Sequence, residues 1–286
     1  MIRLALRVAR ADAELVLADL LELAPAGVEE IELSARDGGS ALVEYAVYGP
    51  PGELPELPDL QALAGGVKVE LSSSEVPDDW AERWKRFHRP VLVETPGGSV
   101  PSLHVRPPWE AALNRDDACE IVIDPAQAFG TGAHATTRLC LELLLALAAE
   151  DSARAAVLDV GTGSGVLAIA AAKLGYGPVL ALDNDPLSVA ATEANASAAG
   201  VVLEARRHDL RSSTPSAPVV LANLLRPLLF ELAGSIEEAP RHLIASGLLR
   251  EEADEVSQLL ARRLSLRERE RRERGEWAAL WLQRPR

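Results

Sequence analysis

The sequence has few cysteines, few aromatic residues and no long apolar run. Only two of its 286 residues are cysteine, aromatic residues make up 4%, and no run of eighteen apolar residues occurs. Cys119 and Cys140 are too few for a disulfide framework or a clustered zinc site, so we expect both to pack as small apolar groups. Because the first residues also lack a charged segment followed by an apolar one, we expect a cytoplasmic protein with no membrane partner.

Positive charge is also scarce. Lysine and arginine number 29 against 43 aspartate and glutamate residues, which gives a formal net charge of −14. Such a charge repels nucleic-acid phosphates, so we expect no direct nucleic-acid partner. A basic protein partner is compatible with it, although the charge by itself selects no partner and keeps many enzymes soluble.

The length favours two structural units. The first 74 residues alternate patterns typical of strands and helices in the order β-α-β-β-α-β, which predicts a small α+β domain of the ferredoxin-like kind. We interpret Ser72-Ser73-Ser74 as the start of a linker and predict that Pro77 opens a connecting helix reaching about Phe87. The predicted boundaries are therefore 1–74, 75–90 and 91–286. The four expected strands of the first domain are Ile2 to Val8, Val28 to Leu33, Ala41 to Tyr48 and Val67 to Leu71.

Beyond residue 155, strand-like runs alternate with helical runs, which predicts a mostly parallel sheet covered by helices on both faces. The last two runs, Leu264 to Arg271 and Trp277 to Gln283, are joined by a short turn around Glu273-Arg274-Gly275, so these two strands must pair antiparallel. The alternating Arg and Glu of Arg267 to Arg274 is typical of a solvated edge strand, where charge suppresses pairing between sheets.

A glycine-rich loop follows one of the expected strands. Ala156 to Val160 runs into Gly161-Thr162-Gly163-Ser164-Gly165 and then into a helix. Glycines allow a ligand to approach the backbone at the carboxyl end of a strand. Since Val166 stands where the dinucleotide fingerprint requires its third glycine, the cofactor need not carry a pyrophosphate.

Three polar residues stand at the ends of successive expected strands. Asp183, twenty residues beyond Gly163, can bind both hydroxyls of a ribose, because Asp185 is better placed to cap the next helix. Asp209 can accept a hydrogen bond from an adenine amino group, although an ordinary turn role is nearly as compatible. The amide oxygen of Asn223 can accept a hydrogen bond from an amine nucleophile and orient its lone pair.

Three segments together resemble the bacterial ribosomal protein L11 methyltransferase (PrmA) family. They are the loop and helix start Asp124 to Thr137, the strand and glycine loop Leu158 to Ala170, and Ala222-Asn223-Leu224-Leu225. Asp79 to Pro90 is similar to the linker helix of that family, and Ala245 to Leu249 to its fifth strand and turn. The resemblance covers residues 75 to 286, whereas the N-terminal region matches only in its predicted topology.

The resemblance implies a class I, Rossmann-like methyltransferase domain with a seven-stranded sheet, and a small substrate-recognition domain before it. Its cofactor would be S-adenosylmethionine, released as S-adenosylhomocysteine. Its substrate would be a basic large-subunit ribosomal protein, methylated on lysine side chains and the N-terminal α-amine. Carried over, cofactor contacts fall on Thr137, Gly161, Asp183 and Asn223, with Phe129 and Thr131 lining the catalytic site. From the residues themselves we add Gly163 and Asp209 as cofactor contacts.

Methyl transfer from a sulfonium needs an oriented neutral amine, not a covalent nucleophile, so we expect no metal and name Asn223 as the residue that orients the amine. We expect a monomer. The alternatives are a methyltransferase acting on another protein or a small amine, a nicotinamide-dependent oxidoreductase, and a non-catalytic cofactor-binding protein that assists ribosome assembly. Val166 and the antiparallel hairpin disfavour the oxidoreductase.

Overall fold

The computed structural model describes residues 2–13, 16–17, 20, 28–33, 42–49, 69–75, 88–94, 98–125, 134–150 and 153–285. The chain divides into two units, Met1–Phe87 and His88–Arg286.

The first unit contains a four-stranded antiparallel sheet in the order β2-β3-β1-β4. Alternating apolar residues of the two central strands bury one face, where Leu6 and Tyr45 are at most 1% exposed. The pairing is the one expected for the β-α-β-β-α-β pattern. The second helix of that pattern is expected between the third and fourth strands, where residues 50–68 lie outside the described residues. The elements are β1 (Ile2–Ala9), the short 3-10 helix η1 (Arg10–Asp12), β2 (Glu29–Leu33), β3 (Leu42–Gly49) and β4 (Glu70–Glu75).

The interpretation of Ser72-Ser73-Ser74 as linker was wrong. These serines lie within β4 and pair with Ala5, Leu4 and Arg3 of β1. Because β4 is an edge strand and the serine side chains are exposed, the backbone pairing alone keeps them in the sheet, and small polar side chains are tolerated there. The connecting helix expected from Pro77 to Phe87 lies outside the described residues.

The second unit is organised around a seven-stranded sheet in the order β10-β9-β8-β11-β12-β14-β13. The first five strands in this order are parallel, and β14 pairs antiparallel with both β12 and β13. This confirms the predicted parallel sheet with an antiparallel hairpin at one edge. The strands are β8 (Val157–Val160), β9 (Val179–Asp183), β10 (Glu204–Arg207), β11 (Val219–Asn223), β12 (His242–Leu249), β13 (Arg267–Arg274) and β14 (Trp277–Gln283).

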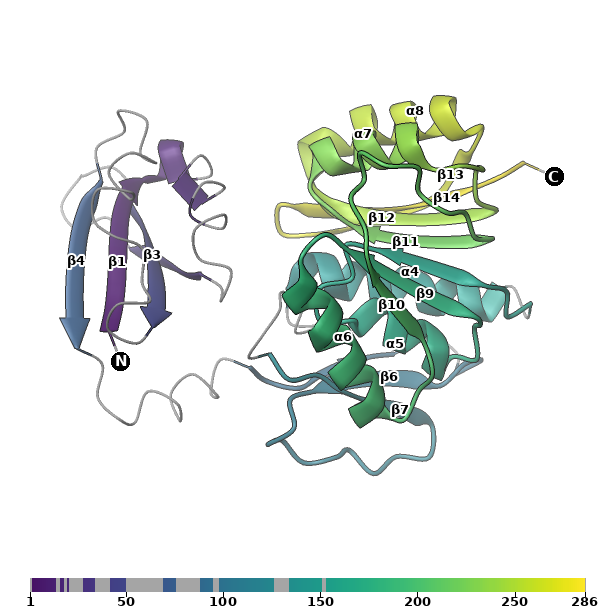
Figure 1. Cartoon of the computed structure of the whole chain (residues 1–286), viewed down its shortest axis with the longest axis horizontal. Coiled ribbons are helices and arrows are strands. Elements are labelled where there is room, and N and C mark those ends of the chain that lie inside the picture. Colours follow the sequence, from purple (N-terminus) through teal and green to yellow (C-terminus); the bar gives the residue numbers. More distant parts are fainter. Residues whose placement is uncertain are drawn as a thin grey trace. The chain divides into compact units, whose positions relative to one another are not determined.

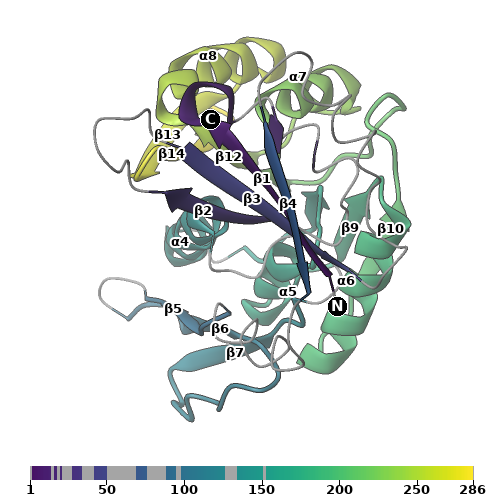
Figure 2. The ribbon, with the colours of Figure 1, turned by 90° about the vertical axis from the view of Figure 1, so that its left-hand side faces the viewer.

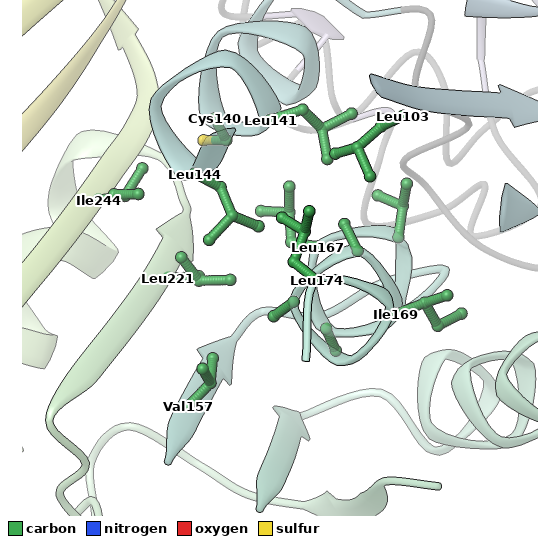
Figure 3. Close-up of a cluster of buried hydrophobic side chains, with 14 of the residues drawn as sticks. Leu103, Cys140, Leu141, Leu144, Val157, Leu167, Ile169, Leu174, Leu221 and Ile244 are labelled. Atoms are coloured by element: carbon green, nitrogen blue, oxygen red, sulfur yellow. The ribbon is translucent and has the colours of Figure 1, made fainter. Parts of the chain in front are cut away.

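Helices cover both faces of this sheet. In Figure 1, α4, α5 and α6 lie on one face and α7 and α8 on the other, and Figure 2 again shows α7 and α8 together. Each face has its own apolar core. Figure 3 shows the first core, in which Leu144 of α4 and Leu167 of α5 meet Val157, Leu221 and Ile244 of the sheet. The helices are α4 (Ala135–Glu150), α5 (Val166–Lys173), α6 (Pro186–Ala199), α7 (Arg226–Ser235) and α8 (Ala253–Leu264), with η2 (Arg250–Glu252) before α8.

A separate three-stranded sheet precedes α4. It consists of β5 (Val91–Val93), β6 (Ser102–Arg106) and β7 (Ala118–Val122), in that order. Leu103 and Ile121 of this sheet are buried in the core of α4 and α5. Within the described part of the chain, no helix has the length and apolar character needed to cross a membrane.

The edge-strand interpretation of Arg267–Arg274 is confirmed. β13 forms one edge of the large sheet, and its side chains are exposed or half-buried. Its cations pair with acidic residues of neighbouring helices: Arg274 and Arg272 contact Glu142 of α4 at 2.9 and 3.7 Å, and Arg271 contacts Asp254 of α8 at 2.8 Å. The strand is therefore charge-compensated.

Candidate functional site

The carboxyl ends of three adjacent strands gather the residues singled out in the sequence. β9, β8 and β11 are neighbours in the sheet, and they end at or just before Asp183, Gly161 and Asn223. In parallel sheets of this kind, ligands bind in the crevice outside the carboxyl ends of the strands. Residues far apart in sequence are thus brought to one edge.

The glycine loop is hydrogen-bonded to the end of β9. The N–H groups of Gly161 and Thr162 both donate to the carbonyl oxygen of Leu182, at 2.8 and 3.0 Å, and Gly163 donates to Asp183 Oδ2 at 2.9 Å. Gly161 and Gly163 have φ values of +71° and +54°, a region in which other residues are strained. Three backbone donors of the loop are therefore used within the protein and are not directed at an anionic ligand.

Asp183 is half-buried, and both of its carboxylate oxygens accept backbone hydrogen bonds. Gly163 donates to Oδ2, and Asp185 donates to Oδ1 at 3.0 Å. Burial raises the pKa of Asp183, although the backbone hydrogen bonds oppose the rise. Asp185 caps α6 by accepting from Leu187 N at 2.9 Å, as the sequence analysis expected. Asp183 therefore has no role as the cap of that helix.

Asp159 lies in the strand that leads into the glycine loop, and it is not among the site residues predicted from the sequence. It is 1% exposed in β8. Its Oδ2 accepts from Thr162 Oγ1 at 2.8 Å and from Ala168 N at 3.1 Å, whereas Oδ1 is buried without a partner among the described residues. Burial raises the pKa of Asp159 to about 7, and the charge of Asp183 contributes to the rise. The sequence did contain a signal for this site residue, because Asp159 is the acidic residue in an otherwise apolar strand.

A cavity of about 240 Å³ opens beside the ends of β8, β9 and β10. Asp183 and Asp209 both line it. Asp209 is exposed, and its Oδ1 accepts from Arg211 N at 2.9 Å, so it also closes a turn. The remaining lining residues are Val160, Gly161, Leu182, Asn184, His208, Leu210, Arg211, Leu224, Leu228 and Glu231.

Asn223 and Thr137 form a pair on the other side of the glycine loop strand. Asn223 Nδ2 donates to Thr137 Oγ1 at 3.3 Å. Thr137 is fully buried in α4. Asn223 Oδ1 is buried and has no hydrogen-bond partner among the described residues. A buried carbonyl oxygen without a partner is unusual in folded proteins, so this atom marks a position where a donor from a ligand is expected.

The loop before α4 is only partly described. Phe129 and Thr131, expected to line the catalytic site, lie outside the described residues. His134 is half-buried, with Nδ1 2.8 Å from Thr136 Oγ1, and its ring contacts that of Trp277 edge-on. Thr136 and Thr137 lie within α4 and not before it, so neither threonine caps the helix from outside.

Leu224 is held between two glycines and forms a wall of the cavity. A Cβ atom at Gly161 would lie 2.2 Å from Leu224 Cδ2, and a Cβ atom at Gly247 would lie 2.4 Å from the Leu224 carbonyl oxygen. Leu224 N also donates to Ser246 O at 3.0 Å. The contact with Gly247 therefore fixes the backbone next to Asn223, whereas Gly161 meets only the end of the Leu224 side chain. Neither contact was predicted from the sequence.

Taken together, these side chains present hydrogen-bond acceptors. Asp159, Asp183, Asp209 and Asn223 all offer oxygen atoms at one edge of the sheet. Such a site suits a ligand that carries donors and positive charge. Over the described ranges, no group of three His, Cys, Asp or Glu side chains could hold a metal ion. Cys140 is buried and Cys119 half-buried, in line with a packing role.

Comparison with known proteins identifies similar sequences along most of the chain. The family model described as ribosomal protein L11 methyltransferase (PrmA) matches residues 57–285. A ribosomal protein L11 methyltransferase from Heliobacterium modesticaldum is 41% identical over 211 residues, 71% of this chain and 63% of the relative. One from Bordetella bronchiseptica is 37% identical over 290 residues, 90% of this chain and 92% of the relative.

A solved structure is also similar. The crystal structure of ribosomal protein L11 methylase from Lactobacillus delbrueckii subsp. bulgaricus superposes with a TM-score of 0.58 and 29% sequence identity. The match covers 68% of this chain and 99% of that chain.

Proposed function

The chain belongs to the ribosomal protein L11 methyltransferase (PrmA) family, and on that premise we propose that it transfers methyl groups from S-adenosylmethionine to amino groups of ribosomal protein L11. The acceptor amines would be lysine side chains and the N-terminal α-amine. The observation that carries the proposal is the cluster of acceptor oxygens at the ends of β8, β9 and β11, with two buried oxygens that have no partner among the described residues.

These acceptors fit the chemistry of the cofactor. S-adenosylmethionine carries an ammonium group, a sulfonium, two ribose hydroxyls and an adenine amino group, all of which are cationic or hydrogen-bond donors. Asp183 would bind the ribose hydroxyls, Asp209 the adenine amino group, and Gly161 and Gly163 would allow the ligand to approach the loop. Asp159 adds a buried carboxylate with one oxygen unsatisfied. The resemblance also assigns cofactor contacts to Thr137 and Asn223.

The residues of this chain would contribute by positioning. The cofactor supplies a methyl group that its sulfonium already activates. Asn223 Oδ1 would accept a hydrogen bond from the substrate amine and direct its lone pair. A lysine must lose a proton before it attacks, and removal from water favours the neutral amine. Phe129 and Thr131 would line this part of the site and exclude water. This scheme assigns no covalent nucleophile.

We further propose that the N-terminal part recognises the substrate, with residues 1–74 as the recognition domain, 75–90 as a linker and 91–286 as the methyltransferase domain. Residues 1–74 carry 13 acidic and five basic residues, a balance that favours a basic partner by electrostatic complementarity. A monomer acting in the cytoplasm on a ribosomal protein is consistent with this proposal.

The test is methyl transfer from labelled S-adenosylmethionine to ribosomal proteins taken from cells that lack this enzyme, followed by mass mapping. The proposal expects label on amines of L11. Label on another protein or a small amine would keep the methyltransferase activity and move the substrate. Cofactor binding without any transfer would favour a non-catalytic role, and binding of a nicotinamide cofactor in place of S-adenosylmethionine would contradict the proposal.

A further inference from the structure

The side chain of Thr137 forms a hydrogen bond with the side-chain amide of Asn223. Thr137 lies in the first turn of α4, fully buried, and it is 86 residues away from Asn223 in the sequence. Its Oγ1 accepts the hydrogen bond that Asn223 Nδ2 donates at 3.3 Å. An asparagine amide has donors on one side and an acceptor on the other, and in this structure the donor side faces Thr137 and the acceptor Oδ1 lies on the opposite side of the amide.

The orientation has a chemical consequence. With Nδ2 directed at Thr137, the oxygen Oδ1 is the atom left buried without a partner among the described residues. The reverse orientation would leave two N–H donors in its place, and donors repel the N–H groups of an amine. An amine that is to be aligned for attack needs an acceptor at this position.

We propose that Thr137 is a positioning residue that acts through Asn223: its hydroxyl holds the Asn223 amide so that Oδ1 faces the substrate amine. This inference rests on the proposed function. It goes beyond a cofactor contact for Thr137, because it predicts an effect on the catalytic step that depends on Asn223.

The backbone supports the same arrangement. Leu224 N donates to Ser246 O at 3.0 Å, and Gly247 packs against the backbone of Leu224, so the main chain next to Asn223 is fixed. The side-chain amide remains free to rotate about its own bonds. The Thr137 hydroxyl supplies the missing constraint on this rotation.

The test compares Thr137→Val, which keeps the shape of the side chain and removes the hydroxyl, with Thr137→Ser, which keeps the hydroxyl. We expect Thr137→Val to lower kcat about 10- to 100-fold, since small misplacements of reacting groups cost up to about 100-fold. Because Thr137 is also assigned as a cofactor contact, calorimetry can show some loss of affinity for S-adenosylmethionine, but this loss should be about threefold at most and thus smaller than the loss in kcat. Thr137→Ser should restore most of kcat. Thr136→Val, which removes the neighbouring buried hydroxyl, is the matched control and should leave kcat within about threefold.

A double-mutant cycle tests whether Thr137 affects kcat through Asn223. In an Asn223→Ala background, Thr137→Val should change kcat by less than about twofold, because residues that act through one another are not additive. Full additivity, or a loss of cofactor affinity equal to the loss of activity, would overturn the inference and leave Thr137 as a cofactor contact. If wild-type protein is active on L11 and Thr137→Val keeps its kcat, only the inference fails. If the wild type does not methylate L11, the proposed function fails and the inference falls with it.

Discussion

Gly247→Ala should destabilise the second unit and misplace Asn223. Gly247 has a φ of +84°, and a left-handed conformation costs a residue with a Cβ about 1–2 kcal/mol. The new Cβ would also lie 2.4 Å from the Leu224 carbonyl oxygen and 2.7 Å from its carbon. These are backbone atoms that cannot rotate away, and overpacking of this kind costs about 1–3 kcal/mol. The expected loss is therefore about 2–5 kcal/mol in the free energy of unfolding.

Two other glycines allow the cost of the positive φ to be measured separately from the cost of the steric overlap. Gly200 also has a positive φ, +66°, but an added Cβ would meet no atom within 4 Å, and Gly234 in α7 is equally open without the positive φ. Gly200→Ala should therefore lose only the conformational part. Gly234→Ala should gain about 0.5–1 kcal/mol, the usual effect of alanine in a helix.

The assay is thermal unfolding of the three variants together with methyl transfer. For a unit of this size, 1 kcal/mol corresponds to roughly 2–4 °C in Tm, so Gly247→Ala should lower Tm by about 4–20 °C. Transfer measured below the transition should also fall, because the Leu224 backbone carries Asn223. A Gly247→Ala variant with the Tm of Gly200→Ala and full activity would refute the claim that this contact positions the site.

Three further predictions concern cofactor affinity, the pH dependence of stability and the salt dependence of KM. Asp183→Asn should weaken binding of S-adenosylmethionine about 10- to 100-fold in calorimetry, since hydrogen bonds to a charged group contribute about 1.5–3 kcal/mol, whereas Asp185→Asn keeps a good helix cap and should bind normally. The pKa of Asp159, about 7 in the folded chain against an ordinary 3.8, means that the folded state holds this proton more tightly. The free energy of unfolding should thus fall as pH rises from about 4 to about 7; urea titrations of Asp159→Asn should lack this part of the decline, and an unchanged slope would contradict the assignment. Added salt should raise KM for L11 several-fold with little change in kcat, because the net negative charge of residues 1–74 attracts a basic substrate and salt screens that attraction; a KM independent of salt would argue against electrostatic recognition.

Elements with strong local signals could be predicted from the sequence. The glycine loop, the alternation of strands and helices, and the short turn at Gly275 predicted the parallel sheet and its antiparallel hairpin. Asp185 before Pro186 was recognised as a cap because an acidic N-cap followed by proline is a local pattern. Where the signal was only composition, as in Ser72-Ser73-Ser74, the prediction was wrong, because pairing with β1 decided the conformation.

The contacts within the site could not be predicted in the same way. Contact between Thr137 and Asn223 joins segments 86 residues apart, and only the packing of α4 against the sheet brings them together. The packing of Leu224 between Gly161 and Gly247 depends on how closely the ends of β8, β11 and β12 approach one another. Sequence spacing could select Asp183 and Asn223 as candidates, but it could not reveal which of their atoms remain unsatisfied.

Those unsatisfied atoms also explain why the site favours one class of cofactor. In the glycine loop, the N–H groups of Gly161 and Thr162 donate hydrogen bonds to Leu182, and that of Gly163 donates to Asp183. These donors are therefore not available to the phosphates of a dinucleotide. Asp159 Oδ1 instead lacks a donor among the described residues, and so does Asn223 Oδ1 on the adjacent strand, the atom assigned above to the substrate amine. Each buried unpaired oxygen costs about 1–3 kcal/mol. A ligand that brings donors and positive charge offsets this cost, whereas an anionic pyrophosphate would add repulsion from the same carboxylates.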